Sequence, residues 1–195
     1  DLDDLGAGLT EVNVLSTLAR SPMTSAEEKR RYLDELAGTA ERMVTSLDEI
    51  VWAVNPRNDT VVSLAGYFGS YAQRLLELAS VACGLDVAKD LPDHPLDPTF
   101  RQGLFLAFKE AVTNVVRHSG ASHAWLRIAV RDGDLVVEVT DNGRGFQTDA
   151  RRHAGDGLAN MHARLKSLGG DCDVISASNQ GATIRFRAPL PMGWL

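Results

Sequence analysis

The sequence predicts an α+β protein, in which an N-terminal helical hairpin forms a dimeric four-helix bundle and is followed by an α/β sandwich domain. Apolar residues from Leu33 to Val54 alternate at spacings of three and four over three heptads, which is typical of a helix that packs along another helix. Downstream, helical and strand-like periods come in groups rather than in strict alternation, which favours a mixed sheet with helices on one face. Asn55-Pro56 separates the two patterns, so we predict a hairpin over residues 1–55 and a second domain over residues 56–195.

The long helix of the hairpin is predicted to run from about Ser25 to Val54. Ser25-Ala26-Glu27-Glu28 has the form of a capping box, and the residue before Pro56 is disfavoured in the α conformation. Ser21-Pro22-Met23-Thr24 ends a shorter helix upstream, whose apolar residues repeat with the same period: Leu2, Leu5, Leu9 and Val12. Such an αα-hairpin exposes an apolar stripe. An identical chain that completes a four-helix bundle is the favoured partner, and packing on the rest of the same chain is the alternative.

The second domain is predicted to begin with a helix that Gly84 closes, on the evidence of apolar residues at helical spacing: Leu64, Phe68, Tyr71, Leu75 and Leu78. A strand near residues 85–88 and a proline-rich loop over 91–98 follow. Thr99 begins a helix that Ser119-Gly120 ends. Asp132-Gly133 joins strands over 124–130 and 135–140 as a hairpin. The remaining elements are a helix over 158–168 and strands over 171–176 and 182–188.

The composition excludes several classes of protein. The 195 residues carry 20 Lys and Arg against 26 Asp and Glu, a formal net charge of −6, which argues against binding to nucleic acid phosphates. Cys83 and Cys172 are far apart and belong to no Cys/His cluster, so neither a disulfide framework nor a structural zinc site is expected. No apolar run is long enough to span a bilayer, and the sequence opens inside a helical pattern, so we expect a soluble cytoplasmic fragment.

Polar side chains of complementary chemistry follow one another along the helix that starts at Thr99. Glu110 and Asn114 are four residues apart, and Arg117 and His118 come one turn later, so a carboxylate, an amide and basic groups share one face. Such a face suits a metal-bound phosphate. On this segment alone, a merely solvated face of an amphipathic helix explains the pattern as well.

Two glycine-containing loops follow the strands. Asp141-Asn142-Gly143-Arg144-Gly145-Phe146 comes directly after a strand, and Asp141 could accept a hydrogen bond from a ligand amine. Gly155-Asp156-Gly157 precedes a helix that begins with Leu158, so its backbone N–H groups and the helix dipole could bind an anion. Taken singly, each glycine pair is also compatible with an ordinary turn.

The order of these segments carries more information than any one of them. The runs Glu110–His118, Asp141–Phe146, Gly155–Met161 with Arg164, and Gly181-Ala182-Thr183 together resemble the N, G1 and G2 boxes of the histidine-kinase ATPase domain. The resemblance extends over the whole chain, because Asp3–Thr10 and Asp48–Pro56 are similar to the phosphoacceptor and dimerisation helices of the subfamily found with nitrate and degradative-enzyme sensors.

The resemblance implies an ATP-binding domain that uses Mg²⁺. At the phosphate end, Asn114 would bind Mg²⁺ and the catalytic Glu110 would lie beside it. Arg117 and His118 would lie near the phosphates. A flexible lid would also lie along the phosphates, and it would contain Gly155, Gly157 and Leu158. At the base end, Asp141 would accept from the adenine amine and Thr183 would support the base through its hydroxyl, while Gly143 and Gly145 would shape the pocket.

The phosphoacceptor is the departure from the subfamily. Its members carry a histidine directly before the acid that corresponds to Asp3, and here Leu2 stands directly before Asp3. Either the chain lacks a phosphoacceptor, or a chemically modified histidine between these residues has no letter in the sequence. The second explanation is favoured, because deleting one residue from a helix would rotate everything upstream by about 100°. Ala7 stands where members that dephosphorylate their partner typically have glutamine, so weak phosphatase activity is expected.

The resemblance therefore implies a sensor histidine kinase of a two-component system: a homodimer that autophosphorylates and passes phosphate to an aspartate of a response-regulator receiver domain. It would meet a membrane only through a sensor region absent from this sequence, and no nucleic acid partner is implied. The alternative is a nucleotide-binding dimerisation module without phosphoryl transfer, favoured by the absent histidine. Another enzyme of this ATPase fold, such as a serine kinase, is disfavoured by the heptad helices and the Asp3-Asp4-Leu5-Gly6 run.

Overall fold

A computed structural model describes residues 2–54, 59–146 and 156–190 of the chain. The chain divides into two compact units, Asp1–Pro56 and Arg57–Leu195, and each is described here by itself. Among the described residues, no helix is long and apolar enough to cross a membrane.

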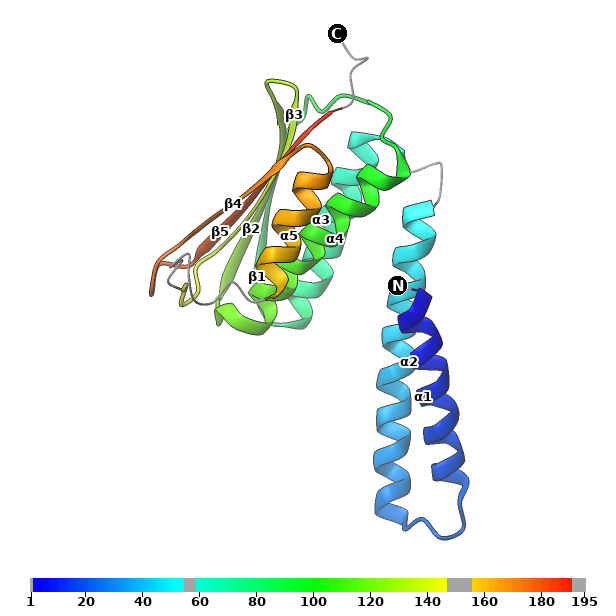
Figure 1. Ribbon diagram of the computed structural model, residues 1–195. Helices are drawn as coiled ribbons and strands as arrows, with labels where there is room; N and C mark the ends of the chain where they lie inside the picture. The colour runs from blue at the N-terminus through cyan, green and yellow to red at the C-terminus, as the bar shows by residue number, and fades with distance from the viewer. Residues whose placement is uncertain (1, 55–58, 147–155, 191–195) are drawn as a thin grey trace. The chain divides into compact units, whose positions relative to one another are not determined.

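The first unit is a hairpin of two helices, α1 (Leu2–Arg20) and α2 (Ala26–Val54) (Figure 1). The predicted capping box is confirmed: the Ser25 N–H donates to Glu28 Oε2 at 2.9 Å, and the Glu28 N–H donates to Ser25 Oγ at 3.3 Å. Leu15 and Thr39 are buried in the hairpin, and Gly8 lies against Met43, where any larger residue would push the helices apart.

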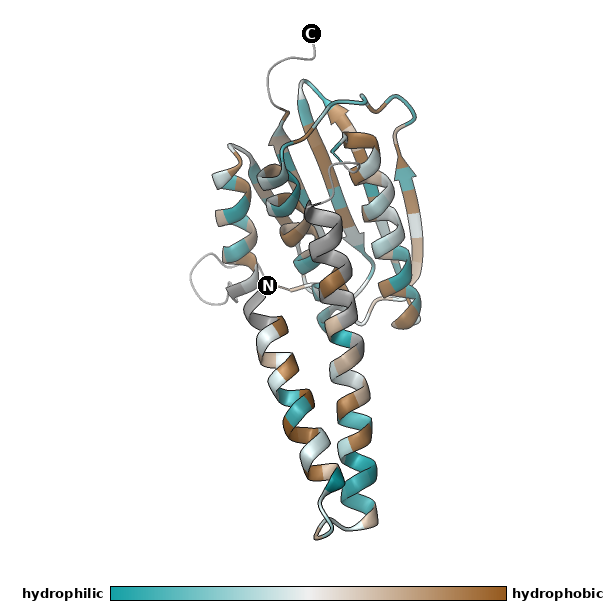
Figure 2. Cartoon of the chain, turned by 90° about the vertical axis from the view of Figure 1, so that its right-hand side faces the viewer, coloured by the Kyte–Doolittle hydropathy of each residue, from teal (hydrophilic) through white to brown (hydrophobic). Residues whose placement is uncertain are grey.

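The second unit is built on a five-stranded mixed sheet with the strand order β1-β2-β3-β5-β4. The strands are β1 (Ala82–Val87), β2 (His123–Arg131), β3 (Asp134–Asp141), β4 (Asp171–Ser176) and β5 (Ala182–Pro189). β1 is parallel to β2 and all other neighbours are antiparallel. Buried and partly exposed residues alternate along β3, so this strand has one face in the core, and Figure 2 shows hydrophobic and hydrophilic residues along the strands of the sheet.

Three helices cover one face of this sheet: α3 (Val61–Leu78), α4 (Pro98–Asn114) and α5 (Asp156–Ser167) (Figure 1). α4 continues into a single π-helical turn, η2 (Val115–Ser119). α3 packs on β1 and β2, α4 packs beside it, and α5 packs over β4 and β5. The predicted fold class, a mixed sheet with helices on one face after a helical hairpin, is confirmed.

Local signals set the ends of the helices. The Thr60 hydroxyl accepts from the Ser63 N–H at 3.2 Å at the start of α3. The Asp97 carboxylate accepts from the Phe100 N–H at 2.9 Å at the start of α4, where Pro98 occupies the first turn.

Aromatic rings form the centre of the core between α3 and α4. Phe68 and Phe108 are stacked with centroids 4.1 Å apart and an interplanar angle of 2°. Tyr71 and Phe105 meet edge to face beside them, with centroids 5.4 Å apart. Because both stacked rings have no exposed surface, their burial contributes strongly to holding the two helices together.

A buried charged side chain holds the segment before α3 in place. The Arg101 side chain on α4 has no exposed surface, and its Nη2 lies 2.6 Å from Asp59 Oδ1. The backbone adds two bonds, from the Leu96 N–H to the Asp59 carbonyl and from the Val61 N–H to the His94 carbonyl. The segment before α3 is therefore held to the loop that leads into α4.

One predicted boundary is wrong. Gly84 does not close α3, which ends at Leu78 with Ala79 as its C-cap and Ser80 at φ 58°. Gly84 instead lies inside β1, which begins three residues earlier than predicted, because pairing with β2 from Ala82 onward overrides the glycine signal.

Truncating the stacked ring in Phe108→Ala should lower the free energy of unfolding of the second unit by about 3–5 kcal/mol, because the cavity cannot collapse between two packed helices. Urea denaturation of the full chain measures it. Leu78→Ala is the matched control, since Leu78 is 79% exposed and its truncation should change the unfolding free energy by less than about 0.5 kcal/mol. Equal losses in the two variants would contradict this account of the core.

Candidate functional site

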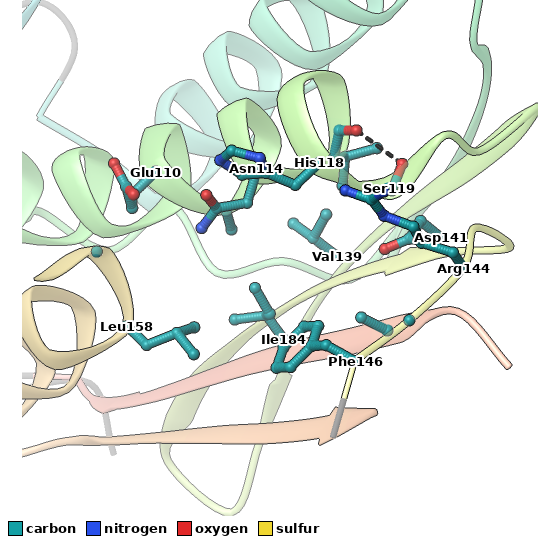
Figure 3. Close-up of a pocket in the computed structure, with 15 residues that line it drawn as sticks. Glu110, Asn114, His118, Ser119, Val139, Asp141, Arg144, Phe146, Leu158 and Ile184 are labelled. Atoms are coloured by element: carbon teal, nitrogen blue, oxygen red, sulfur yellow. Dashed lines mark hydrogen bonds between the residues drawn. The ribbon is translucent and has the colours of Figure 1, made fainter. Parts of the chain in front are cut away.

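A cavity of about 430 Å³ opens between α4 with η2 on one side and the sheet on the other (Figure 3). Apolar side chains form one group of its lining residues: Ala111, Val115, Val139, Phe146, Leu158, Ala182 and Ile184. Polar side chains, together with two glycines, form the other: Glu110, Asn114, His118, Ser119, Asp141, Arg144, Gly145 and Gly157. The cavity is therefore a largely apolar slot with polar groups along its rim and at one end.

α4 supplies the polar rim. Glu110, Asn114 and His118 follow one another at spacings of four residues and all line the cavity, while Phe108 and Val112 on the other side of the helix are buried in the core. The predicted polar face is thus brought together at three of its four positions.

Arg117 is the exception, and the π-helical turn explains it. Arg117 is exposed and does not line the cavity. A π turn bonds residue i to i+5 instead of i+4, so each residue turns the chain less than in an α-helix. Beyond Asn114, this change keeps His118 rather than Arg117 over the cavity. Arg117 is therefore not among the residues brought together at the cavity, and its place near a ligand stays a prediction.

Asp141 ends β3 at the inner part of the slot and is only 7% exposed. Its Oδ1 accepts a hydrogen bond from the Gly143 N–H at 2.7 Å. Burial raises the pKa of this carboxyl, although its hydrogen bonds from the backbone of Gly143 and Ala182 act in the opposite direction. A buried carboxyl with a raised pKa at the end of a cavity is an acceptor poised for a donor on a ligand.

The loop after β3 is held by backbone hydrogen bonds on both sides. The Arg144 N–H donates to the Ser119 carbonyl at 2.8 Å, and the Gly181 N–H donates to the Gly143 carbonyl at 2.9 Å. Gly145, at φ +56°, lines the cavity, whereas Gly143 supports Asp141 without lining it. The loop therefore has one fixed shape between η2 and the β4–β5 turn.

The first turn of α5 closes the cavity opposite Asp141. Gly157 and Leu158 both line it. A Cβ at position 157 would collide with the Glu110 carboxylate, so a larger residue there would force that side chain to move. The predicted Gly155 lies outside the described residues.

Two further predicted residues lie away from the cavity. Thr183 pairs with Thr140 across β5 and β3, their hydroxyl oxygens 3.1 Å apart, and its neighbours Ala182 and Ile184 line the cavity instead. Because side chains alternate between the faces of a sheet, Thr183 points to the face away from the cavity, and its contact with a base stays a prediction that this geometry does not support. Asp3 lies in the first turn of α1, and its side chain is outside the described part of the chain.

The sequence did not identify several lining residues. Arg144 and Phe146 stand inside the Asp141–Phe146 run, so their place in that loop was the available signal. The apolar residues from β3 and β5 carried no signal, because the same alternation describes any half-buried strand.

The donor set suits a ligand that brings its own metal ligands. In residues 2–54, 59–146 and 156–190, no group of three or more His, Cys, Asp or Glu side chains could hold a metal by itself. Mg²⁺ is commonly bound by one or two protein oxygens together with substrate phosphates, and Glu110 and Asn114 supply such oxygens. The arrangement fits a flat base with an amine at one end and an anionic, cation-bound tail at the other.

Residues 100–192 match the protein-family model described as histidine kinase-, DNA gyrase B-, and HSP90-like ATPase. This range contains every residue that lines the cavity. The predicted resemblance to the histidine-kinase ATPase domain is confirmed.

Curated relatives are similar over about half of the chain. The sensor histidine kinase LiaS of Bacillus subtilis is 32% identical over 106 residues, which cover 54% of this chain and 29% of LiaS. The sensor protein VraS of Staphylococcus aureus is 28% identical over 106 residues, covering 54% of this chain and 30% of VraS. The matched region thus spans less than a third of each of these relatives.

Solved structures share the fold of nearly the whole chain. The histidine kinase domain of the blue-light activated histidine kinase EL346 of Erythrobacter litoralis covers 96% of this chain and 94% of its own, with a TM-score of 0.59 and 17% identity. Full-length ShkA in complex with AMPPNP covers 98% of this chain and 44% of its own, with a TM-score of 0.64 and 19% identity. The chain therefore shares the fold of these kinase structures, and residues 100–192 of its second unit match the family model of histidine kinase-, DNA gyrase B-, and HSP90-like ATPases.

Proposed function

We propose that this chain is an ATP-dependent protein histidine kinase of a two-component system, which autophosphorylates and transfers the phosphoryl group to a response-regulator aspartate. The observation that carries the proposal is a single cavity with the buried Asp141 at one end and Glu110, Asn114 and His118 along its rim.

The base end favours adenine over guanine. Asp141 accepts a hydrogen bond from the exocyclic amine of adenine, and a guanine in the same place would turn a carbonyl oxygen toward the carboxylate. The apolar side chains of Val139 and Ile184 lie beside the base, while Gly143 and Gly145 fix the loop that carries Asp141. The proposed base site therefore omits Thr183.

The phosphate end combines a cation site with backbone donors. Asn114 holds Mg²⁺ with the catalytic Glu110 beside it, and His118 reaches the phosphates. Gly155, Gly157 and Leu158 lie along the phosphates, where the N-terminus of α5 favours negative charge. Mg²⁺, when bound, neutralises the charge that develops during phosphoryl transfer, so the residues themselves mainly position the nucleotide.

The hairpin is proposed to be the dimerisation and phosphoacceptor unit, residues 1–55, with the ATP-binding unit over 56–195. Large apolar side chains are exposed along both of its helices: Leu9, Val14, Leu18, Leu33 and Leu47. Their burial in a four-helix bundle with a second copy supports a homodimer. Asp3 then stands next to the phosphoacceptor histidine, whose basicity and tautomer it would set.

A second candidate is a dimeric nucleotide-binding module that does not transfer phosphate. The first histidine in the sequence is His94, so the hairpin as written holds none. Such a module would bind Mg–ATP at the same residues and release it unchanged.

Labelling with γ-³²P-ATP separates the two candidates. The full chain should gain acid-labile, alkali-stable label if a histidine is present beside Asp3, and a variant with histidine inserted between Leu2 and Asp3 should gain it in any case. Intact mass decides whether the native chain equals the 21.1 kDa sequence or carries an additional residue. Bound but untransferred nucleotide in both proteins would favour the module, and acid-stable label on a partner would favour a serine kinase.

Asp141→Asn should weaken ATP binding at least tenfold, about 1.4 kcal/mol, yet leave the fold as stable as before or more stable. Because the carboxyl pKa is raised in the folded state, the ionised form opposes folding, so the native chain gains stability as pH falls through that pKa. The asparagine cannot ionise and should reduce this pH dependence. Calorimetric ATP titration measures the first effect, and thermal unfolding over a pH series that rises from the ordinary Asp pKa of about 4 measures the second.

Asp93→Asn is the matched control, since Asp93 is exposed in the loop before α4 and should affect neither ATP binding nor stability. A destabilised Asp141→Asn variant would show that this carboxylate stabilises the fold rather than serving a ligand.

Asn114→Ala should remove the contribution of Mg²⁺ to ATP affinity, because it deletes the proposed cation ligand without touching the base site. The ratio of ATP affinities with and without Mg²⁺ should fall about tenfold or more, while the affinity for metal-free ATP is retained. Thr113→Ala, at the neighbouring position outside the cavity lining, should keep the native ratio. An unchanged ratio in Asn114→Ala would assign the cation to other groups.

A further inference from the structure

The sheet of the second unit has a free edge at β1, away from the nucleotide cavity. β1 pairs with β2 alone, and the strand order places it at the end of the sheet (Figure 1). The Ala82 N–H donates to the Ser122 carbonyl and the Ala88 N–H donates to the Ile128 carbonyl, both at 2.9 Å. Because successive residues of a strand bond to opposite sides, the backbone groups of Cys83, Leu85 and Val87 point outward. In the described part of the chain, the outward backbone groups of these three residues form no hydrogen bond with another backbone group.

Most side chains around this edge are apolar, and the polar residues that line its groove are Ser70, Gln73 and Lys89. An open groove of about 340 Å³ runs between α3 and β1, and Val62, Leu85 and Val87 are partly exposed along it. The charged residue within β1 is Asp86, whose carboxylate is already paired with Arg127 Nε at 2.8 Å on the other face of the sheet. β1 itself therefore holds no lysine, proline or bulge of the kind with which sheet proteins normally prevent pairing, and Lys89 lies two residues beyond its end.

We propose that β1 pairs in antiparallel fashion with β1 of a second copy of this chain, around a two-fold axis at Leu85. Leu85 then faces the partner's Leu85, and Cys83 faces the partner's Val87. In this register, the outward backbone groups of all three residues in each copy form hydrogen bonds with the other copy. The two sheets join into one sheet of ten strands, twice the five of each copy.

Charge supports this register. Asp86 meets the partner's Gly84, so no like charges face each other across the pair. A two-fold axis at Asp86 would set two aspartates side by side. An axis at Gly84 would require the Val81 N–H, which already donates to the Leu76 carbonyl at 2.8 Å.

The helix layer also fits a second copy. α3 packs on β1 and β2, and neighbouring strands lie about 4.8 Å apart, so α3 and the partner's α3 would lie about 10 Å apart, the distance of ordinary helix packing. Leu85 reaches Gly69 of α3, and Gly66 and Ser70 on the open side of the helix are small and exposed. Each copy thus fills the groove of the other.

A disulfide at the axis tests the pairing in the full chain. In a Cys83→Ser background, Leu85→Cys should form a covalent dimer under mild oxidation, because opposed residues in a hydrogen-bonded antiparallel pair have Cα atoms about 5.5 Å apart, within disulfide range. Cys172 does not interfere, since it is buried and its pKa is raised to about 12.

Ile175→Cys in the same background is the matched control. Ile175 is 60% exposed on β4 at the opposite edge, against 41% for Leu85, so random collisions would favour it. Non-reducing gel electrophoresis should show mainly dimer for Leu85→Cys and mainly monomer for Ile175→Cys. Equal yields, or no dimer from Leu85→Cys, overturn the proposal and leave the edge to a strand of a different protein.

A second pair of variants checks the register and does not depend on Leu85→Cys folding. Val87→Cys should cross-link to the partner's native Cys83, and adding Leu85→Lys should abolish that cross-link by placing charge on the edge. A cross-link that survives Leu85→Lys contradicts strand pairing. No nucleotide is present in these reactions, so their outcome is independent of whether the chain is a kinase.

Discussion

The packing of α4 on the sheet and beside α3 is the constraint on which the rest of the second unit depends. Phe108 and the residues on its side of the helix are buried against the core, which leaves Glu110, Asn114 and His118 no orientation except toward the cavity. The N-terminal end is fixed as well, because the fully buried Arg101 is held by Asp59 from the segment before α3. A buried ion pair of this kind adds little net stability but is costly to break, so it selects one position for the helix. The geometry of the site is thus a consequence of core packing.

Asp141 shows the opposite relation between stability and function. Its burial raises the pKa of the carboxyl, so the charge is held at an energetic cost that no neighbouring cation offsets in the described structure. The same carboxylate also has a structural role. It accepts a hydrogen bond from the Gly143 N–H and so holds the loop that closes the cavity. A ligand amine would complete the hydrogen bonding of the carboxylate. Binding of a ligand amine would therefore offset part of the free-energy cost of burying the Asp141 carboxylate.

Much of the fold followed from local chemistry in the sequence. The Ser25–Glu28 capping box and the Asp132–Gly133 turn, both of whose residues have positive φ, were predictable because each depends on neighbours within a few residues. The places where the structure departs from the expected arrangement have longer-range causes. Pairing with β2 draws Gly84 into β1, a π-helical turn directs Arg117 away from the cavity, and sheet alternation sets Ala182 rather than Thr183 toward it. Each of these is decided by contacts between distant segments, which residue spacing does not encode. The roles of the site residues toward ATP and Mg²⁺ stay predictions.

The cavity and the β1 edge are separate surfaces of one domain, since no residue of α3 or β1 lines the cavity. Nucleotide binding therefore gives no reason for β1 to keep an unprotected edge, which in a free protein carries a risk of aggregation. Gly84 is consistent with this view. Trp125 lies over Gly84, so a side chain at position 84 would displace the indole. Because Gly84 has no side chain, space remains on the face where the partner's Asp86 would lie. An edge that is mainly apolar toward α3, small at Gly84 and free of opposed charge in the proposed register has the properties of an interface rather than of a solvent boundary.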